Sequence, residues 1–248
     1  MVFARSISLF ALSAAAMVWP AWAADSVLVV DRGLPQVNLN NDSGPVRSNV
    51  RWSWHDHGFL GDDFTVGLPG ERWAIDAIRT WAVPGGPEAN LPHLGDFFQD
   101  VRLHFGAGDV TPVAAAQLSP GSDETGNPDV RVSDASAAGT LLYDDFGTRL
   151  RVWQIDFTNL NLAVDGGVKY RFGVWGMGRP KPGAEGEAFT WYNHASNAGL
   201  SGNRQEGADG VMLLFDAAGR SEGTFNGEGN GWDKPSDINV QVFAHRVN

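Results

Sequence analysis

The sequence predicts an all-β protein: an antiparallel β-sandwich, jelly-roll-like, with long loops rich in Gly, Pro and Asn. Two observations support this class. Apolar segments are short, rich in Val, Ile, Phe and Trp, and separated by clusters of Gly, Pro, Asn and Asp. No segment carries the i, i+3, i+4, i+7 apolar stripe of an amphipathic helix for more than about two turns. Many short strands with Gly-rich turns are typical of sandwiches and jelly rolls.

The N-terminus, residues 1–23, has the pattern of a secretory signal peptide. Arg5 supplies a positive charge, an apolar run follows over 7–18, and Ala21-Trp22-Ala23 matches an A-x-A cleavage site. We therefore expect a secreted protein, extracellular or periplasmic, whose mature chain is one sandwich domain over 24–248.

The composition restricts the partners. The net charge is −11, and removal of Arg5 with the signal peptide makes it about −12. Nucleic acid and anionic membranes need basic patches, so neither is expected as a partner. No later segment reaches the roughly 18 apolar residues of a spanning helix, so we expect no membrane insertion. The chain has no cysteine, which excludes a disulfide scaffold.

The strands are predicted from Val-, Ile- and aromatic-rich runs between turn residues. They are expected over 26–30, 48–56, 63–66, 72–83, 100–105, 139–143, 149–157, 168–175, 188–192, 211–215 and 238–246. The long loops between them, which are the usual location of functional residues, are 84–99, 106–129, 176–187, 193–210 and 216–237. The residues expected in the core are Trp73, Ile75, Trp153, Phe172, Val174, Val240 and Val242.

The stretch WSWHDHGFLGDDF, residues 52–64, is the densest cluster of aromatic, His and Asp residues. In a strand, Trp52 and Trp54 face one side and His55 and His57 the other. We expect the two tryptophans in the core and a bend over Gly58–Gly61. One alternative exposes the tryptophans as a stacking platform for sugar rings.

The second alternative for this stretch is a metal site. His55 and His57 lie on one side of the strand with Asp62 near by, which is similar to the start of a cupin metal motif. Zinc usually takes three or four protein ligands, and no partner motif follows. The strand interpretation is therefore preferred.

A weak calcium loop is predicted in NGEGNGWDKPSD, residues 226–237. Oxygen-bearing side chains alternate around Gly231 at the bend, as a hard cation requires. The predicted ligands of this structural calcium are Asn226, Glu228, Asn230 and Asp237. Asn at the first position, Asp at the last and Pro235 depart from the calcium-binding pattern, and an ordinary Gly- and Asn-rich turn is the alternative.

A ligand-binding loop is predicted where AFTWY runs into 193–210. An aromatic residue provides a stacking face, and amide, imidazole and guanidinium groups hydrogen-bond to sugar hydroxyls. The candidate residues are Trp191, Tyr192, Asn193, His194 and Arg204. Trp191 and Tyr192 point to opposite faces, so we expect one of them to be exposed. A solvated loop held by its own Asn side chains is the alternative.

No catalytic residue is assigned. GRSEG, residues 219–223, matches the G-x-S-x-G pattern, but a nucleophile elbow needs a strand, a turn and a helix in an α/β fold. Paired acids are frequent, and glycoside hydrolysis needs two carboxylates about 5–10 Å apart across a cleft. Tyr192 with His194 is a second possible pair for a lyase.

GDDFTV, RWAIDAIRTW and the closing SDINVQVFAHRV resemble strands of exported bacterial jelly-roll or β-sandwich proteins, many of them carbohydrate-binding or adhesion modules. The resemblance implies a secreted non-catalytic binding module for polysaccharide or cell-surface glycan. A polysaccharide hydrolase or lyase on the same scaffold and a structural surface protein are the alternatives.

Overall fold

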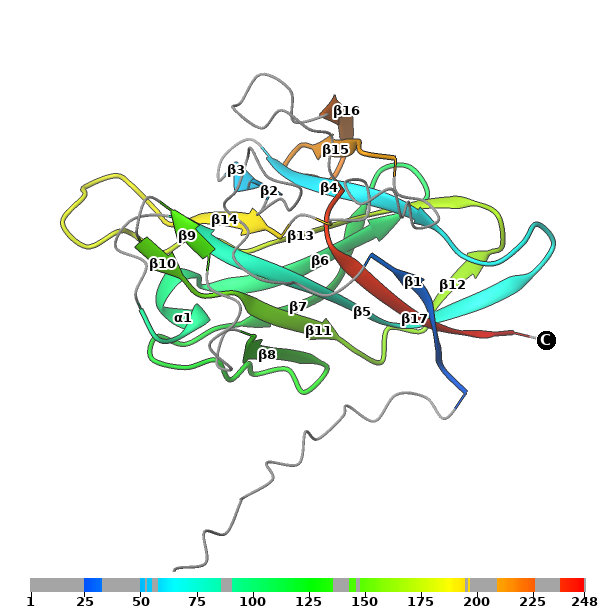
Figure 1. The fold of residues 1–248 in the computed structure, drawn as a ribbon, viewed down its shortest axis with the longest axis horizontal. Coiled ribbons are helices and arrows are strands. Elements are labelled where there is room, and N and C mark those ends of the chain that lie inside the picture. Colours follow the sequence, from blue (N-terminus) through cyan, green and yellow to red (C-terminus); the bar gives the residue numbers. More distant parts are fainter. Residues whose placement is uncertain are drawn as a thin grey trace, which may run out of the picture.

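The structure of the chain is a computed structural model. It describes residues 25–32, 50–51, 53–54, 58–85, 91–135, 143–145, 148–194, 196, 209–225 and 237–247. This part is nearly all β, and two antiparallel sheets pack against each other (Figure 1). The predicted all-β sandwich is confirmed.

The first sheet, sheet A, has eight strands in the described part. Their order is β1-β17-β5-β11-β8, with β12 and β14 also paired to β5, and β2 paired to β14. The bounds are β1 (Val27–Asp31), β2 (Val50–Arg51), β5 (Arg72–Gly85), β8 (Val130–Asp134), β11 (Trp153–Phe157), β12 (Leu162–Asp165), β14 (Thr190–Asn193) and β17 (Val240–Arg246).

The second sheet, sheet B, has seven strands in the described part, in the order β16-β15-β4-β13-β6-β7 with β3 paired to β4. The bounds are β3 (Ser53–Trp54), β4 (Gly58–Thr65), β6 (Asp100–Gly106), β7 (Thr111–Gln117), β13 (Lys169–Trp175), β15 (Met212–Phe215) and β16 (Ser221–Phe225). A separate hairpin joins β9 (Tyr143–Asp145) to β10 (Thr148–Leu150). The chain passes repeatedly from one sheet to the other, as in jelly-roll-like sandwiches.

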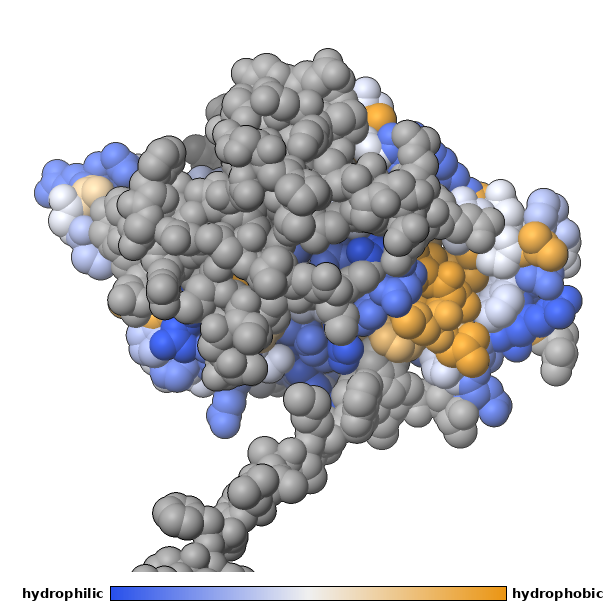
Figure 2. All heavy atoms as spheres, viewed as in Figure 1, coloured by the Kyte–Doolittle hydropathy of each residue, from blue (hydrophilic) through white to orange (hydrophobic). Residues whose placement is uncertain are grey.

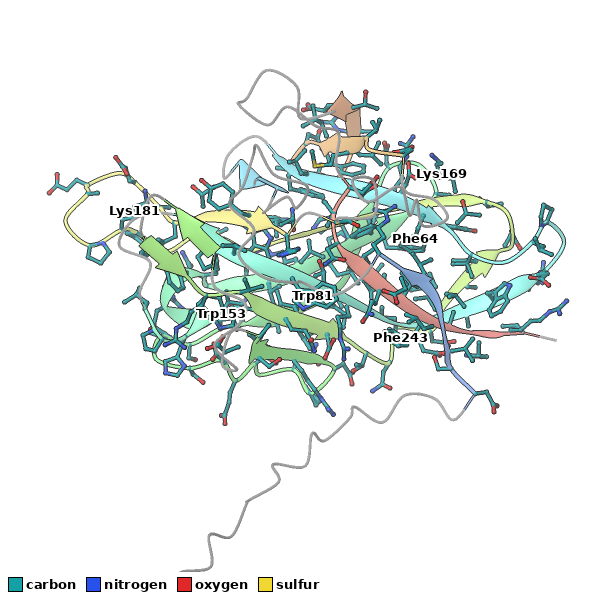
Figure 3. The ribbon with its side chains drawn as sticks, in the orientation of Figure 1. Phe64, Trp81, Trp153, Lys169, Lys181 and Phe243 are labelled. Atoms are coloured by element: carbon teal, nitrogen blue, oxygen red, sulfur yellow. The ribbon has the colours of Figure 1, made fainter. Side chains whose placement is uncertain are left out.

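The long strand β5 organises sheet A. Its side chains point alternately to the two faces of the sheet, and the residues from Ala74 to Val83 are all buried. Ile78 lies between Val242 of β17 and Phe157 of β11, and all three are buried. Figure 3 shows Trp81 of β5 and Trp153 of β11 in the middle of the molecule. Because four strands pair with β5, its ends position the residues discussed below.

A short helix, α1 (Leu94–Phe97), packs against the core. The Phe97 ring lies edge-on to Trp153, with ring centroids 5.5 Å apart. The Asp123 carboxylate accepts hydrogen bonds from the Leu94 amide at 2.6 Å and from the Trp153 indole at 3.1 Å. Within the described ranges, no helix combines the length and apolar character needed to span a membrane.

The core prediction holds for six of its seven residues and is wrong for one. Buried as predicted are Ile75, Trp153, Phe172, Val174, Val240 and Val242. Trp73 is only partly buried and packs against the edge of the core. The reason is its position near the start of β5, where the sheet ends.

Two strand predictions need correction. Residues 58–61 form the first half of β4 and not a bend. Gly61 is needed there because a Cβ atom would lie 2.1 Å from the Phe172 carbonyl oxygen of the neighbouring strand. The strands missed by sequence reasoning are β7, β8, β12 and β16, of which β7 and β16 lie in predicted loops. The side chains of Trp52, Trp54, His55 and His57 lie outside the described residues.

Candidate functional site

Two of the groups of charged side chains in the described part of the chain have opposite surroundings. The first, the Arg32 cluster, consists of Arg32, Asp62, Asp63, Lys169 and Asp237, and lies between the sheets. The second, the Trp73 pocket, is open to solvent and is lined by Arg72, Trp73, Ala163, Val164, Asp165 and Val247.

The Arg32 cluster joins β1, β4 and the start of β17. Nη1 of Arg32 donates to the Asp62 carboxylate at 2.7 Å and to the Ile238 carbonyl oxygen at 3.1 Å. Nη2 donates to the Asp63 carbonyl oxygen at 2.5 Å. Asp62 also accepts the Ile238 amide at 2.6 Å. The guanidinium therefore connects the two sheets through one buried network.

Burial dominates the electrostatics of this network. The side chains of Arg32 and Asp62 are both 0% exposed. Burial raises the pKa of Asp62 to about 7, and the attraction of Arg32 offsets only part of this effect. Burial also raises the pKa of Asp237, whose carboxylate lies 4.0 Å from Nη1 of Arg32. One guanidinium thus faces two carboxylates that both resist ionisation.

Lys169 carries the second positive charge of the cluster. Its Nζ atom lies 3.1 Å from Oδ1 of Asp63 and 3.5 Å from Oδ2 of Asp209. Figure 3 labels Lys169 near Phe64, and the β13–β4 pairing sets Lys169 opposite Thr65, the residue after Phe64. The Lys169 side chain is half exposed, so the network reaches solvent through Lys169 and not through Arg32.

Asp237, predicted as the last calcium ligand, faces hydrogen-bond donors. Its carboxylate accepts the Asp209 and Gly210 amides at 3.2 and 3.1 Å, in addition to its contact with Arg32. These donors occupy the oxygens that a cation would need. Asn226, Glu228 and Asn230 lie outside the described residues, so calcium binding stays a prediction. In the part that the structure describes, no three His, Asp or Glu side chains are grouped as a metal site.

The structure places most of the predicted sugar-binding residues inside the protein. Trp191 is 0% exposed, and its indole donates to the Asn193 side chain at 3.0 Å. Asn193 and His194 are also buried, whereas Tyr192 is partly exposed. A buried indole has no free face for a sugar ring, so Trp191 belongs to the core, and Tyr192 is the partly exposed member of the pair. Arg204 lies outside the described residues.

The candidate catalytic acids and the candidate catalytic histidine are buried. Asp62 and Asp237 are the two acids that one guanidinium brings together, and both are enclosed, with 0% and 1% of the residue exposed. His194, the partner of Tyr192 in the lyase alternative, is 0% exposed. A polysaccharide chain needs an open cleft to reach such groups. The Arg32 cluster therefore connects the two sheets, and both of these acids are enclosed.

The residues that line the Trp73 pocket lie at the start of β5, in β12 and just after β17. Figure 1 shows these segments together at one end of sheet A. Trp73 pairs with Val164 on one side and Arg246 on the other. The Val247 amide donates to the Arg72 carbonyl oxygen at 2.8 Å. The pocket encloses about 330 Å³, which is at the small end of the range for ligand sites.

Glu71 fixes the indole of Trp73. Oε2 of Glu71 accepts the indole N–H at 3.1 Å and the Leu68 amide at 2.9 Å, while Oε1 lies 3.3 Å from Arg246. The Leu68 amide, then the indole, lower the pKa of Glu71. Gly67 (φ +61°) allows the turn before β5 to lie close to the Trp73 indole, because a Cβ atom at this position would lie 2.1 Å from the indole nitrogen. The tryptophan is thus held in place before any ligand arrives.

The rim of the pocket carries a charged pair that is free to bind. Nε of Arg72 lies 3.7 Å from Oδ1 of Asp165, beyond hydrogen-bond length. Their side chains are 79% and 67% exposed. An exposed pair of this kind contributes little to stability, so both groups remain able to bond a ligand.

Apolar surface surrounds this end of the molecule. Figure 2 shows a hydrophobic patch over the region of β1, β17 and β12. Val27, Leu28 and Val247 are exposed by 53%, 43% and 43%. The pocket lining thus combines apolar residues with a donor and an acceptor at the rim, which suits a ligand with hydroxyl groups. Trp73 and Arg72 follow one another in β5 and leave it on opposite faces of the sheet, so the indole packs on the core side while the charged pair lies on the solvent side.

Sequence reasoning missed this site because it assigned Trp73 to the core. The signal that was present is the charge pattern around it: Glu71 and Arg72 precede Trp73 directly, and Gly70 marks a turn. A large aromatic residue next to a turn and two charges is more exposed than one in the middle of a strand.

Comparisons with known proteins identified no relative of this chain. A scan against protein-family models, a search of curated proteins and a search of solved structures each gave no match. The structure itself shows the class of protein, an all-β sandwich of two antiparallel sheets, with an open pocket at the start of β5.

Proposed function

We propose that the chain is a secreted, non-catalytic binding module for polysaccharide or cell-surface glycan, and that the Trp73 pocket is its sugar-binding site. The observation that carries the proposal is the pocket itself. Its lining includes Trp73, a partly exposed residue whose indole Glu71 holds, and an exposed Arg72–Asp165 pair whose hydrogen-bonding groups remain accessible to a ligand.

The chemistry of the pocket supports a sugar. Aromatic faces suit the apolar C–H faces of pyranose rings. Arg72 donates and Asp165 accepts hydrogen bonds. Stacking and a few hydrogen bonds supply about 4–6 kcal/mol, which corresponds to a Kd from tens of micromolar to millimolar. The resemblance of the strand sequences to carbohydrate-binding modules points the same way.

The proposal is tested with a glycan panel. Three quantities are measured together. They are the retention of the protein on each glycan, quenching or a blue shift of its tryptophan fluorescence, and the appearance of new reducing or unsaturated ends. We expect saturable binding without new ends. New ends would support the hydrolase or lyase alternative, and no binding to any glycan would contradict the proposal.

Two exposed arginines provide a matched pair of variants. Arg72→Ala removes a side chain that is 79% exposed at the pocket, and Arg220→Ala removes one that is 74% exposed at the β15–β16 turn. We expect Arg72→Ala to weaken glycan binding about tenfold, the equivalent of one charge-assisted hydrogen bond. Arg220→Ala is expected to bind like the original protein. Equal losses of glycan affinity in the two variants would contradict the assignment of the sugar-binding site to the Trp73 pocket.

A further inference from the structure

The pocket has a third polar neighbour, a His–Asp pair that the proposed function does not use. Nδ1 of His245 lies 3.0 and 2.9 Å from the two carboxylate oxygens of Asp76. The Ser26 hydroxyl donates to Oδ2 of the same carboxylate at 2.7 Å. The Asp76 side chain is largely buried, whereas 32% of the His245 side chain is exposed. The carboxylate therefore holds an imidazole at the surface.

The strand register places His245 next to the pocket. His245 pairs with Ala74 of β5, and Ala74 pairs on its other side with Ala163, which lines the pocket. His245 and Ala163 thus lie two strand spacings apart, about 10 Å. Val247, another lining residue, follows His245 by two positions and so lies on the same face.

The hydrogen bond to Asp76 decides what the other ring nitrogen does. A carboxylate only accepts, so Nδ1 carries the proton in the neutral imidazole and Nε2 becomes an acceptor. No hydrogen bond from a described residue to Nε2 is present. The ring therefore offers a free acceptor beside the pocket.

Three polar groups then border the apolar floor. Nε2 of His245 and the Asp165 carboxylate accept hydrogen bonds, and the Arg72 guanidinium donates. A ligand that bonds to all three groups must donate two hydrogen bonds and accept one. Sugar hydroxyls do both, whereas the carboxylates and sulfates of acidic sugars only accept.

We infer that the Trp73 pocket selects neutral, hydroxyl-bearing sugar residues over acidic ones. His245 is the residue that determines this specificity, and Asp76 is a positioning residue that fixes its tautomer. The inference rests on the proposed function. The net charge of −11 adds a long-range repulsion of anionic glycans.

The test uses glucan, mannan and galactan oligosaccharides, each beside its C6-oxidised uronate. Affinities are measured at about 0.05 M and 0.5 M salt, because high salt screens the long-range repulsion and leaves direct contacts. We expect the protein to bind the neutral member of a pair at least tenfold more tightly at both salt concentrations. Tighter binding of the uronate, or a preference that vanishes at high salt, would overturn the inference.

Substitutions test whether His245 causes the preference for neutral sugars. His245→Ala is expected to weaken binding of the neutral sugar about tenfold and to leave uronate binding unchanged. His245→Gln, whose amide oxygen accepts a hydrogen bond, is expected to restore part of the preference. Asp76→Asn is expected to reduce the ratio of the two affinities, a change that mere loss of packing does not produce.

The failures of the two proposals are distinguishable. If Arg72→Ala weakens glycan binding while His245→Ala leaves both affinities unchanged, the inference about His245 is wrong and the proposed function stands. If the original protein binds none of the six oligosaccharides or the wider panel, both are wrong. Thermal melting of each variant shows whether a loss of binding reflects a loss of folding.

Discussion

The Arg32 cluster and the Trp73 pocket are made from the same residue types, yet their surroundings give them opposite roles. In each, an arginine lies beside an aspartate. The Arg32 and Asp62 side chains are 0% exposed and 2.7 Å apart, whereas those of Arg72 and Asp165 are 79% and 67% exposed and 3.7 Å apart. Buried charges must satisfy one another, while exposed charges keep their bonding capacity for a ligand. Burial, and not residue type, therefore separates the structural Arg32–Asp62 pair from the Arg72–Asp165 pair that we propose binds a ligand.

The largest predicted difference between the two pairs is in stability. Arg32→Ala leaves Asp62 and Asp237 buried without their guanidinium, which is expected to cost about 3–5 kcal/mol. Arg72→Ala is expected to change stability by less than about 0.5 kcal/mol. Urea denaturation of both variants measures the contrast. Similar costs for the two substitutions would show that the Arg32 cluster is hydrated and that the comparison is wrong.

The pH dependence of stability should follow the Arg32 cluster. Burial raises the pKa of Asp62 to about 7, whereas in the unfolded chain it titrates near 3.9. Between about pH 4 and 7 the folded protein therefore holds a proton that the unfolded chain has lost. The resulting stability is fully present below about pH 4 and is lost as the pH rises through 7. The raised pKa of Asp237 acts in the same direction.

Melting temperatures between pH 5 and 8 test this. The lowered pKa values of Glu71 and Asp216 affect stability only at more acidic pH. Burial lowers the pKa of His104 to about 4, so this residue makes stability rise with pH up to about 6.5 and opposes Asp62 in that range. Above about pH 6.5, where His104 no longer contributes, we expect the melting temperature to fall as the pH rises, and Asp62→Asn to flatten this slope. A flat or rising profile of the original protein in this upper range would contradict the assignment to Asp62.

A smaller effect is expected from the turn that supports Trp73. Gly67 and Gly70 both have positive φ angles, +61° and +92°, where alanine costs roughly 1–2 kcal/mol. An added Cβ at Gly67 would lie 2.1 Å from the Trp73 indole nitrogen, but at Gly70 it meets nothing within 4 Å. Both alanine variants are expected to lose stability, and only Gly67→Ala to lose glycan affinity as well. Equal affinities in a fluorescence titration would show that the position of Trp73 does not matter for binding.

The sequence was most informative about the strands that carry large apolar residues. Period-two alternation in β6, β13 and β17 predicted those strands closely. Strands without that pattern were missed: β7 has the sequence TPVAAAQ, and β16 begins in a Gly-rich segment. Small and polar residues give a weak strand signal, and pairing with a neighbouring strand decides their structure.

The candidate site was less predictable because it depends on contacts between distant residues. Arg32 and Asp62 are 30 positions apart, and the Ile238 amide that binds Asp62 is 176 positions away. Nothing local distinguishes Asp62 from the adjacent Asp63. Likewise, alternation in AFTWY predicted that Trp191 and Tyr192 face opposite sides, but only the fold showed that the tryptophan faces the core.

The claim that the Trp73 pocket binds sugar is tested most directly by NMR. The tryptophan indole N–H signals are followed while a neutral oligosaccharide that the protein binds is added. Trp73→Phe identifies the Trp73 signal, and Trp81 and Trp153, both buried, serve as internal controls. We expect a saturable shift of the Trp73 signal with little change at the two controls. A saturable shift of other signals with Trp73 unaffected would contradict the claim that this pocket binds the sugar.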